Sequence, residues 1–161
     1  MKGKKAQAAM EFLMTYGWAI LIVVIAVAAL AGFGLFDTNR FVQDTCNSGS
    51  ATGIVCTTNQ VAVDTNTGTV TMALSNGAHA RVNITNVEGT SCTVSNWDIL
   101  KNGASIKGQA INDGDQFNLQ VTCSNGISGK KFDDKFKVTY TNVDNGLSGL
   151  TTNIDVIKKL Q

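Results

Sequence analysis

The chain has 161 residues, enough for one domain with a modest core, and a formal net charge of +1. This balance gives no electrostatic basis for a nucleic-acid partner. Charge is unevenly placed, because Lys2, Lys4 and Lys5 precede a long apolar run whose only nearby acid is Glu11. The remainder is nearly neutral and rich in Thr, Asn, Gly, Ser and Val, which predicts a β domain with a polar surface.

The apolar run extends from Phe12 to Phe36 without a charged residue, over 25 positions. A helix needs about 20 apolar residues to cross a bilayer. A helix of this composition is apolar on every face, so it must be surrounded by lipid or by other protein. The lysines before it mark the cytoplasmic side of a membrane, and the rest of the chain then faces outward.

Two ordinary interpretations of this run leave Glu11 without a role. A secretory signal peptide would be cleaved after Ala31, but its apolar region is usually only about 7–15 residues long and is preceded by positive charge alone. A simple transmembrane anchor accounts for the length of the run and for the lysines. Neither explains a carboxylate at the head of the helix, which is unfavourable in hydrocarbon unless it is paired.

The segment KKAQAAMEFLMTYGWAILIVV resembles the class III signal peptide of archaeal type IV pilins. The resemblance implies that a prepilin peptidase cleaves between Ala6 and Gln7 on the cytoplasmic side, and that the helix stays in the mature subunit. It also implies that Glu11, the fifth mature residue, meets the free amine of a neighbouring subunit during assembly. Ala6 departs from the glycine that related prepilins often carry before the cut. The resemblance covers about the first 36 residues.

Three parts are therefore expected: a cleaved peptide over residues 1–6, a hydrophobic helix over residues 7–41 and a head domain over residues 42–161. The helix would serve as a transient transmembrane segment and as filament core, and would be about 50 Å long at ~1.5 Å per residue. In the head, alternating segments separated by Asn-Gly, Asp-Gly and Ser-Gly signals predict seven strands. These are Gln60–Asp64, Val70–Ser75, Ala80–Val87, Thr93–Lys101, Gln116–Cys123, Lys135–Asn142 and Thr151–Ile157.

Strands of this number and spacing predict an immunoglobulin-like β-sandwich, so the fold class is α+β with a long N-terminal helix and an all-β head. The apolar positions that alternate along the strands are predicted to form its core. They are Val61, Val63, Val70, Met72, Leu74, Val82, Ile84, Trp97, Ile99, Phe117, Leu119, Val121, Phe136, Val138, Tyr140, Ile154 and Val156.

The four cysteines all follow the apolar run and are even in number, which favours two disulfides in an exported domain. Three pairings are open. Cys46–Cys56 would close a short Gly/Ser/Thr loop, and Cys92–Cys123 would join distant strands, so we favour that pairing. The alternatives are free thiols in a reducing compartment or a zinc site. The sequence lacks CxxC and has a single histidine, His79, so it does not have the spacing of structural zinc ligands.

Other motifs in the head offer little chemistry. Asn83-Ile84-Thr85 is an N-x-S/T sequon, with Asn83 expected to face outward on a strand where a glycan fits. Residues 112–115 (NDGD) resemble part of a calcium loop but lack its later glutamate, which favours a tight turn. Residues 130–137 (KKFDDKFK) are expected to form a solvated strand with local ion pairs. No nucleophile, metal site or cofactor loop is recognisable, so neither an enzyme nor a cofactor is expected.

These observations predict a structural subunit of an archaeal type IV pilus-like surface filament that serves adhesion. Its expected partners are identical subunits in a helical homopolymer, the prepilin peptidase, the assembly machinery and, for the precursor, the cytoplasmic membrane. An archaellin shares the plan of helix plus β head, but its N-terminal signature differs. A membrane-anchored or secreted β-sandwich binding module is the alternative from another functional class.

Overall fold

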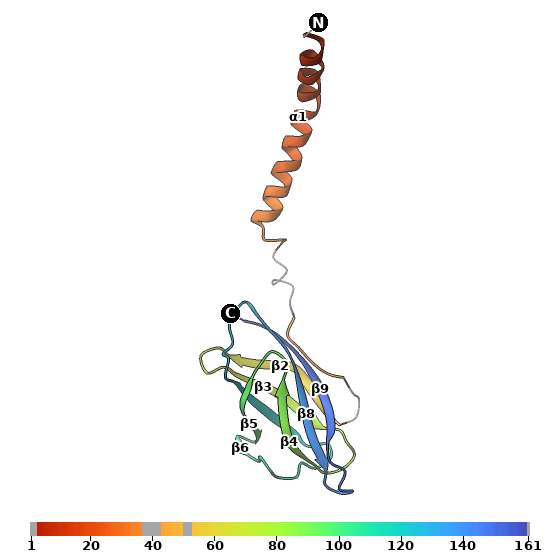
Figure 1. Ribbon diagram of the computed structural model, residues 1–161, viewed down its shortest axis with the longest axis vertical. Coiled ribbons are helices and arrows are strands. Elements are labelled where there is room, and N and C mark those ends of the chain that lie inside the picture. The colour runs from red at the N-terminus through yellow and green to blue at the C-terminus, as the bar shows by residue number, and fades with distance from the viewer. Residues whose placement is uncertain (1–2, 37–42, 50–52, 161) are drawn as a thin grey trace. The chain divides into compact units, whose positions relative to one another are not determined.

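The computed structural model describes residues 3–36, 43–49 and 53–160 of the chain. The chain divides into two compact units, Met1–Phe41 and Val42–Gln161. The first unit holds helix α1 and the second holds two antiparallel β-sheets (Figure 1). The predicted α+β layout, a single apolar helix followed by a β head, is confirmed.

Helix α1 spans Gly3–Gly32. Ala, Leu and Met favour a helix there, and the chain contains no proline to interrupt it. The β-branched stretch between Ile20 and Val27 has a lower helix propensity, but surroundings can override propensity in an apolar segment. Apolar side chains occupy every face of the helix rather than one stripe, as the sequence predicts.

The C-terminus of α1 is a glycine cap, and it lies earlier than the sequence suggested. Gly34 adopts a φ of 69°, and the amide of Leu35 donates to the carbonyl oxygen of Leu30 at 3.2 Å. This left-handed residue with a six-to-one hydrogen bond is a Schellman motif, which ends a helix. Helix α1 therefore ends at Gly32, before the predicted end at Phe41, and residues 37–41 of the predicted helix lie outside the described residues.

The head forms two antiparallel sheets, one with the strand order β1-β9-β8-β4 and one with the order β2-β3-β7-β5-β6 (Figure 1). All strand pairs in the two sheets are antiparallel. The strands are β1 (Thr45–Ser48), β2 (Ile54–Asp64), β3 (Thr69–Asn76), β4 (Val82–Gly89), β5 (Val94–Lys101), β6 (Ala104–Ser105), β7 (Gln116–Cys123), β8 (Lys131–Asn142) and β9 (Leu150–Lys159). The seven predicted strands correspond to β2–β5 and β7–β9, whereas β1 and β6 were not predicted.

The register of each sheet follows the alternation in the sequence. β8 and β9 form an unbroken ladder from Lys131↔Lys159 to Tyr140↔Leu150. β2, β4 and β5 each contain a register shift, and the one in β2 separates Cys56 from Val61. Such bulges disrupt the edge of a sheet locally and limit its pairing with other chains.

One hydrophobic core lies between the inward faces of the two sheets, and most predicted core residues are buried in it. Val63 and Trp97 are exceptions, because they are only partly buried and pack against the core. Lys107 covers Trp97, with its Nζ 4.0 Å from the ring centroid. Further buried residues that were not predicted include Ile54, Val87, Ile111, Ile127, Phe132 and Leu160.

Candidate functional site

The stretch Met14–Gly32 of α1 is long and apolar enough to cross a membrane, with 19 residues and a mean hydropathy of 2.3. None of this stretch is buried in the structure. Its length is about 28 Å, close to the ~30 Å of a hydrocarbon core. By length and composition, this helix suits a membrane anchor or a signal sequence. Its side chains are available to lipid or to other protein.

Glu11 is exposed and lies just before this stretch. Its backbone carbonyl oxygen accepts a hydrogen bond from Thr15 Oγ1 at 2.8 Å. Ala6 and Gln7, the predicted cleavage residues, lie within α1, although their side chains are outside the described ones. Gln7 and Glu11 are four positions apart in α1, which is about one helical turn. Cleavage before Gln7 would leave a new amine one helical turn from Glu11.

The head contains two disulfides, in the pairing favoured from the sequence. Cys46 bonds to Cys56 and Cys92 bonds to Cys123, with Cα–Cα distances of 5.9 and 5.2 Å. The first bond joins β1 to β2, and therefore links the two sheets. The second joins the connection between β4 and β5 to the end of β7. All four cysteines lie within the described residues and are bonded, so none of them is a free thiol or a zinc ligand.

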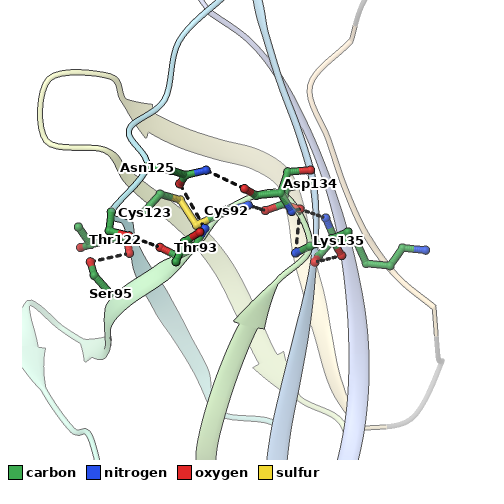
Figure 2. Close-up of a disulfide and its surroundings, with 11 residues drawn as sticks. Cys92, Thr93, Ser95, Thr122, Cys123, Asn125, Asp134 and Lys135 are labelled. Carbon is green, nitrogen blue, oxygen red and sulfur yellow. Dashed lines mark hydrogen bonds between the residues drawn. A yellow bond between two sulfur atoms is a disulfide. The ribbon is translucent and has the colours of Figure 1, made fainter.

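A buried carboxylate holds the loop that carries Cys92 (Figure 2). Asp134 on β8 is only 5% exposed. Its Oδ1 accepts from the amides of Thr90 (3.1 Å) and Ser91 (2.7 Å), and its Oδ2 accepts from the amide of Cys92 (2.8 Å). Oδ1 also accepts from the amide of Lys135 at 2.8 Å. These backbone amides therefore replace the water that the carboxylate loses on burial.

Asn125 completes the attachment of this loop to the other sheet. Its Oδ1 accepts from the amide of Thr93 at 3.2 Å, and its Nδ2 donates to the carbonyl oxygen of Ser91 at 2.7 Å (Figure 2). Asn125 lies two residues after Cys123. Residues 90–93 are thus held by β8 on one side and by the end of β7 on the other, next to the disulfide.

The segment over residues 130–137 is only partly solvated. One local ion pair is present as predicted, with Lys131 Nζ 2.7 Å from Asp133. Two other lysines pair across strands instead, Lys135 Nζ at 3.1 Å from Asp155 on β9 and Lys137 Nζ at 3.8 Å from Glu88 on β4. Phe132, Asp134 and Phe136 instead lie on the buried face of β8. The prediction of a solvated strand is wrong for this face, because the carboxylate of Asp134 finds backbone donors there.

The two sheets differ in surface charge. The exposed face of β8 carries four charged residues in a row, namely Lys131, Asp133, Lys135 and Lys137. The middle strands of the other sheet, β3 and β7, contain no charged residue, and their outward side chains, which are exposed or half-buried, are Thr, Ser, Ala, Asn and Gln. Shallow hollows over these strands are lined by residues such as Ala73 and Asn118, together with the charged Asp44, Lys101 and Lys158 of neighbouring segments.

The beginning of the head is attached to its last strand. Asp44 accepts hydrogen bonds from Lys158 Nζ and from the amide of Lys159. The Lys158 ammonium group, through this hydrogen bond, holds the pKa of Asp44 below its ordinary value of 3.8, against a smaller opposing effect of burial. The pair joins the residue before β1 to the end of β9.

Asn83 lies on β4, in the predicted sequon, and is half-buried. Its Nδ2, the atom that a glycan would occupy, donates to the carbonyl oxygen of Gly108 at 3.4 Å. Its Oδ1 is enclosed and has no hydrogen-bond partner. Thr85, the third residue of the sequon, donates from Oγ1 to the carbonyl oxygen of Thr139 at 3.2 Å. Glycosylation of Asn83 stays a prediction, and it would displace the contact with Gly108.

The remaining candidates form turns. Residues 112–115 close a tight turn, in which the amide of Asp115 donates to the carbonyl oxygen of Asn112 at 3.1 Å. His79 is exposed, and its Nδ1 lies 3.7 Å from Asp113. Within the described ranges, no group of three or more His, Cys, Asp or Glu residues is arranged to hold a metal ion.

The residues that organise the head were not predicted from the sequence, namely Asp134, Asn125, Asp44 and Lys158. A signal was present for Asp134, which follows Phe132 by two positions and precedes Phe136 by two. In a strand, these three side chains share one face. No comparable signal marks the others.

No protein-family model, no curated protein and no solved structure matches this chain.

Proposed function

We propose that the chain is the structural subunit of a type IV pilus-like filament on an archaeal cell surface. The observation that carries this proposal is helix α1, which has apolar side chains on every face and an unburied stretch from Met14 to Gly32. The head has its own core and two disulfides, so it does not need the helix as a core element. The helix is therefore available for lipid before assembly and for other subunits afterwards.

In this proposal, the precursor is inserted into the cytoplasmic membrane with its N-terminus inside and is cleaved between Ala6 and Gln7. The helices then leave the membrane and bundle in the filament core, while the heads form the outer wall and provide adhesion. Lipid is itself apolar, so the preference for helix–helix contact must come from close packing. Small residues along α1, such as Gly17, Ala26 and Ala29, permit such packing.

In the proposed filament, Glu11 sets the axial register of neighbouring helices during assembly. A charged carboxylate within the hydrocarbon costs about 3 kcal/mol. The amine created at Gln7 of a neighbouring subunit neutralises this charge only where the two helices stand in one axial register. A buried ion pair contributes little net stability, but it favours one alignment over others.

The head is proposed to be an immunoglobulin-like sandwich with a structural rather than a catalytic role. Two antiparallel sheets around a shared core are consistent with that architecture. Its disulfides suit a domain that works outside the cell.

The first test is the N-terminus and mass of protein sheared from the cell surface. A chain that begins at Gln7 is the expected result, and the role given to Glu11 requires a free α-amine there, because cyclisation of the glutamine would remove that amine. A chain that begins at Gly32 would indicate ordinary secretion, and an intact Met1 would indicate a membrane anchor. Either result would overturn the proposal.

The second test addresses Glu11. Glu11→Ala should be inserted and cleaved as in the parent protein but should yield about tenfold fewer filaments, which corresponds to about 1.4 kcal/mol. Thr15→Ala, one helical turn further along, is the matched control and should assemble normally. Normal filament yield from Glu11→Ala would contradict the role given to this residue.

A further inference from the structure

The head contains four Asn-Gly pairs, at Asn76, Asn102, Asn125 and Asn145. In such pairs, the glycine nitrogen can attack the asparagine Cγ, since glycine has no Cβ to hinder the approach. The attack forms an N–Cγ bond and releases the side-chain nitrogen as ammonia, with the proton of the glycine amide. Water then opens the cyclic imide at either carbonyl, which yields aspartate or isoaspartate without any change in oxidation state.

The fold restrains the pair at Asn76. This side chain is only 1% exposed, and its Nδ2 donates to the carbonyl oxygens of Ala80 (2.8 Å) and Ile111 (2.9 Å). The attacking atom is also engaged, because the amide of Gly77 donates to the carbonyl oxygen of Gly53 at 2.7 Å. Reaction at this pair requires these hydrogen bonds to break.

The pair at Asn125 is restrained in a similar way. Its Oδ1 and Nδ2 are bonded to the loop that carries Cys92, through Thr93 and Ser91 (Figure 2). The amide of Gly126 donates to the carbonyl oxygen of Cys123 at 3.3 Å. The Asn125 side-chain amide and the attacking Gly126 nitrogen are therefore both engaged in other hydrogen bonds, which must break before they can react.

The pair at Asn145 is also restrained. Its Oδ1 accepts from the amide of Leu147 at 3.0 Å. The amide of Gly146 donates to the carbonyl oxygen of Asn142 at 3.0 Å. This pair is exposed to solvent, so its restraint comes from hydrogen bonds rather than burial.

The pair at Asn102 differs from the other three. Asn102 and Gly103 are the two central residues of the β5–β6 hairpin, with φ values of 53° and 81°, and both are exposed. In the described parts of the chain, no hydrogen bond holds the Asn102 side chain or the Gly103 amide. A Cβ built on Gly103 would meet no atom within 4 Å, so the space around the attacking nitrogen is open.

We propose that Asn102 is a site of spontaneous deamidation in the folded protein, and that the fold protects the other three Asn-Gly pairs. The product adds one negative charge next to Lys101, whose Nζ lies 2.7 Å from Asp115. The isoaspartate form also adds one backbone atom to a two-residue hairpin turn, whose geometry sets the register of β5 and β6.

Peptide mapping by mass spectrometry tests the proposal on the full-length folded protein kept in mildly alkaline buffer. Conversion at Asn102 should be at least about tenfold faster than at each of the other pairs. A tenfold factor corresponds to about 1.4 kcal/mol, comparable to one hydrogen bond that the protected pairs must break first. Asn102→Gln should abolish this modification and leave the other three rates unchanged.

The same chain, reduced and unfolded in denaturant, is the control for the role of the fold. All four pairs should then react at similar rates, because each has the same dipeptide sequence. Faster conversion at Asn76, Asn125 or Asn145 in the folded protein would overturn the proposal, as would equal rates at all four. Persistence of the Asn102 preference in the unfolded chain would assign it to local sequence and would equally refute the structural explanation.

Discussion

Asp134→Asn retains the size of a buried side chain but removes its charge and converts one acceptor oxygen into an NH2 donor. In the native head, the two carboxylate oxygens accept from the amides of Thr90, Ser91, Cys92 and Lys135. The most favourable asparagine orientation keeps Oδ1 in place, where it has most of its donors. The new NH2 group then faces the amide of Cys92, where neither can accept.

The expected loss of stability follows from these contacts. A hydrogen bond to a charged group contributes about 1.5–3 kcal/mol, and a buried donor left unpaired costs about 1–3 kcal/mol. These values overlap rather than add, so we expect a loss of about 2–4 kcal/mol in the free energy of unfolding. Since small domains are stable by only about 5–15 kcal/mol, such a loss is easily measured.

Urea unfolding of a head fragment beginning at Gln43 provides the assay. All residues of the core cluster and both disulfides lie within this fragment. The variant should shift the midpoint without changing the slope m. Asp133→Asn is the matched control, because Asp133 is exposed on the same strand and, among the described residues, forms its ion pair with Lys131 at the surface. The control should change stability by no more than about 0.5 kcal/mol. Equal effects of the two substitutions would refute the structural role of Asp134.

Three further predictions concern the head. Replacing Cys46 and Cys56 with serine should lower the free energy of unfolding by about 2–3 kcal/mol, because the unfolded chain loses a closed loop. Urea unfolding measures this change, and a loss below about 1 kcal/mol would argue against it. The pKa of Asp44 is lower in the folded head than its ordinary value of 3.8, so its contribution to stability is complete above that pH and is lost as the pH falls through the folded pKa. Lys158→Ala should therefore reduce the loss of stability on acidification, and an unchanged stability–pH curve would contradict the pairing. Phe136→Ala should cost about 3–5 kcal/mol, because this fully buried ring leaves a cavity in the core. Thermal unfolding measures this loss of stability. A variant with the same melting temperature as the parent would contradict the prediction and would show that the core can collapse around the cavity.

The strands of the head could be predicted where one face of the strand is exposed to solvent and the other is buried. β7 has the predicted bounds, Gln116–Cys123, because apolar and polar residues alternate along its whole length. β1 and β6 could not be predicted, since segments of four and two residues carry too little alternation. Their positions depend instead on tertiary features, namely the Cys46–Cys56 bond and the hairpin turn at Asn102.

The residues that organise the head are harder to predict, for two different reasons. Asp134 lies on the apolar face by its spacing from Phe132 and Phe136, but its charge suggests an exposed position unless its donors are known. Three of its four donors lie 42 to 44 positions earlier in the chain. Asp44 and Lys158 are 114 positions apart, and nothing local in the sequence relates them. Polar groups so far apart in the sequence are brought together by the fold, so their pairing cannot be inferred from a local sequence pattern.

The start of the head illustrates what such long-range contacts achieve. β1 has only four residues, and short strands near the beginning of a domain fray unless they are held. It is held by its ladder with β9, by the ion pair of Asp44 with Lys158 and by the bond from Cys46 to Cys56. The ladder and the ion pair join β1 to the end of the chain, while the disulfide joins it covalently to the other sheet. In the filament proposed above, a force applied to the head at Asp44 would therefore be shared between both sheets from the first strand.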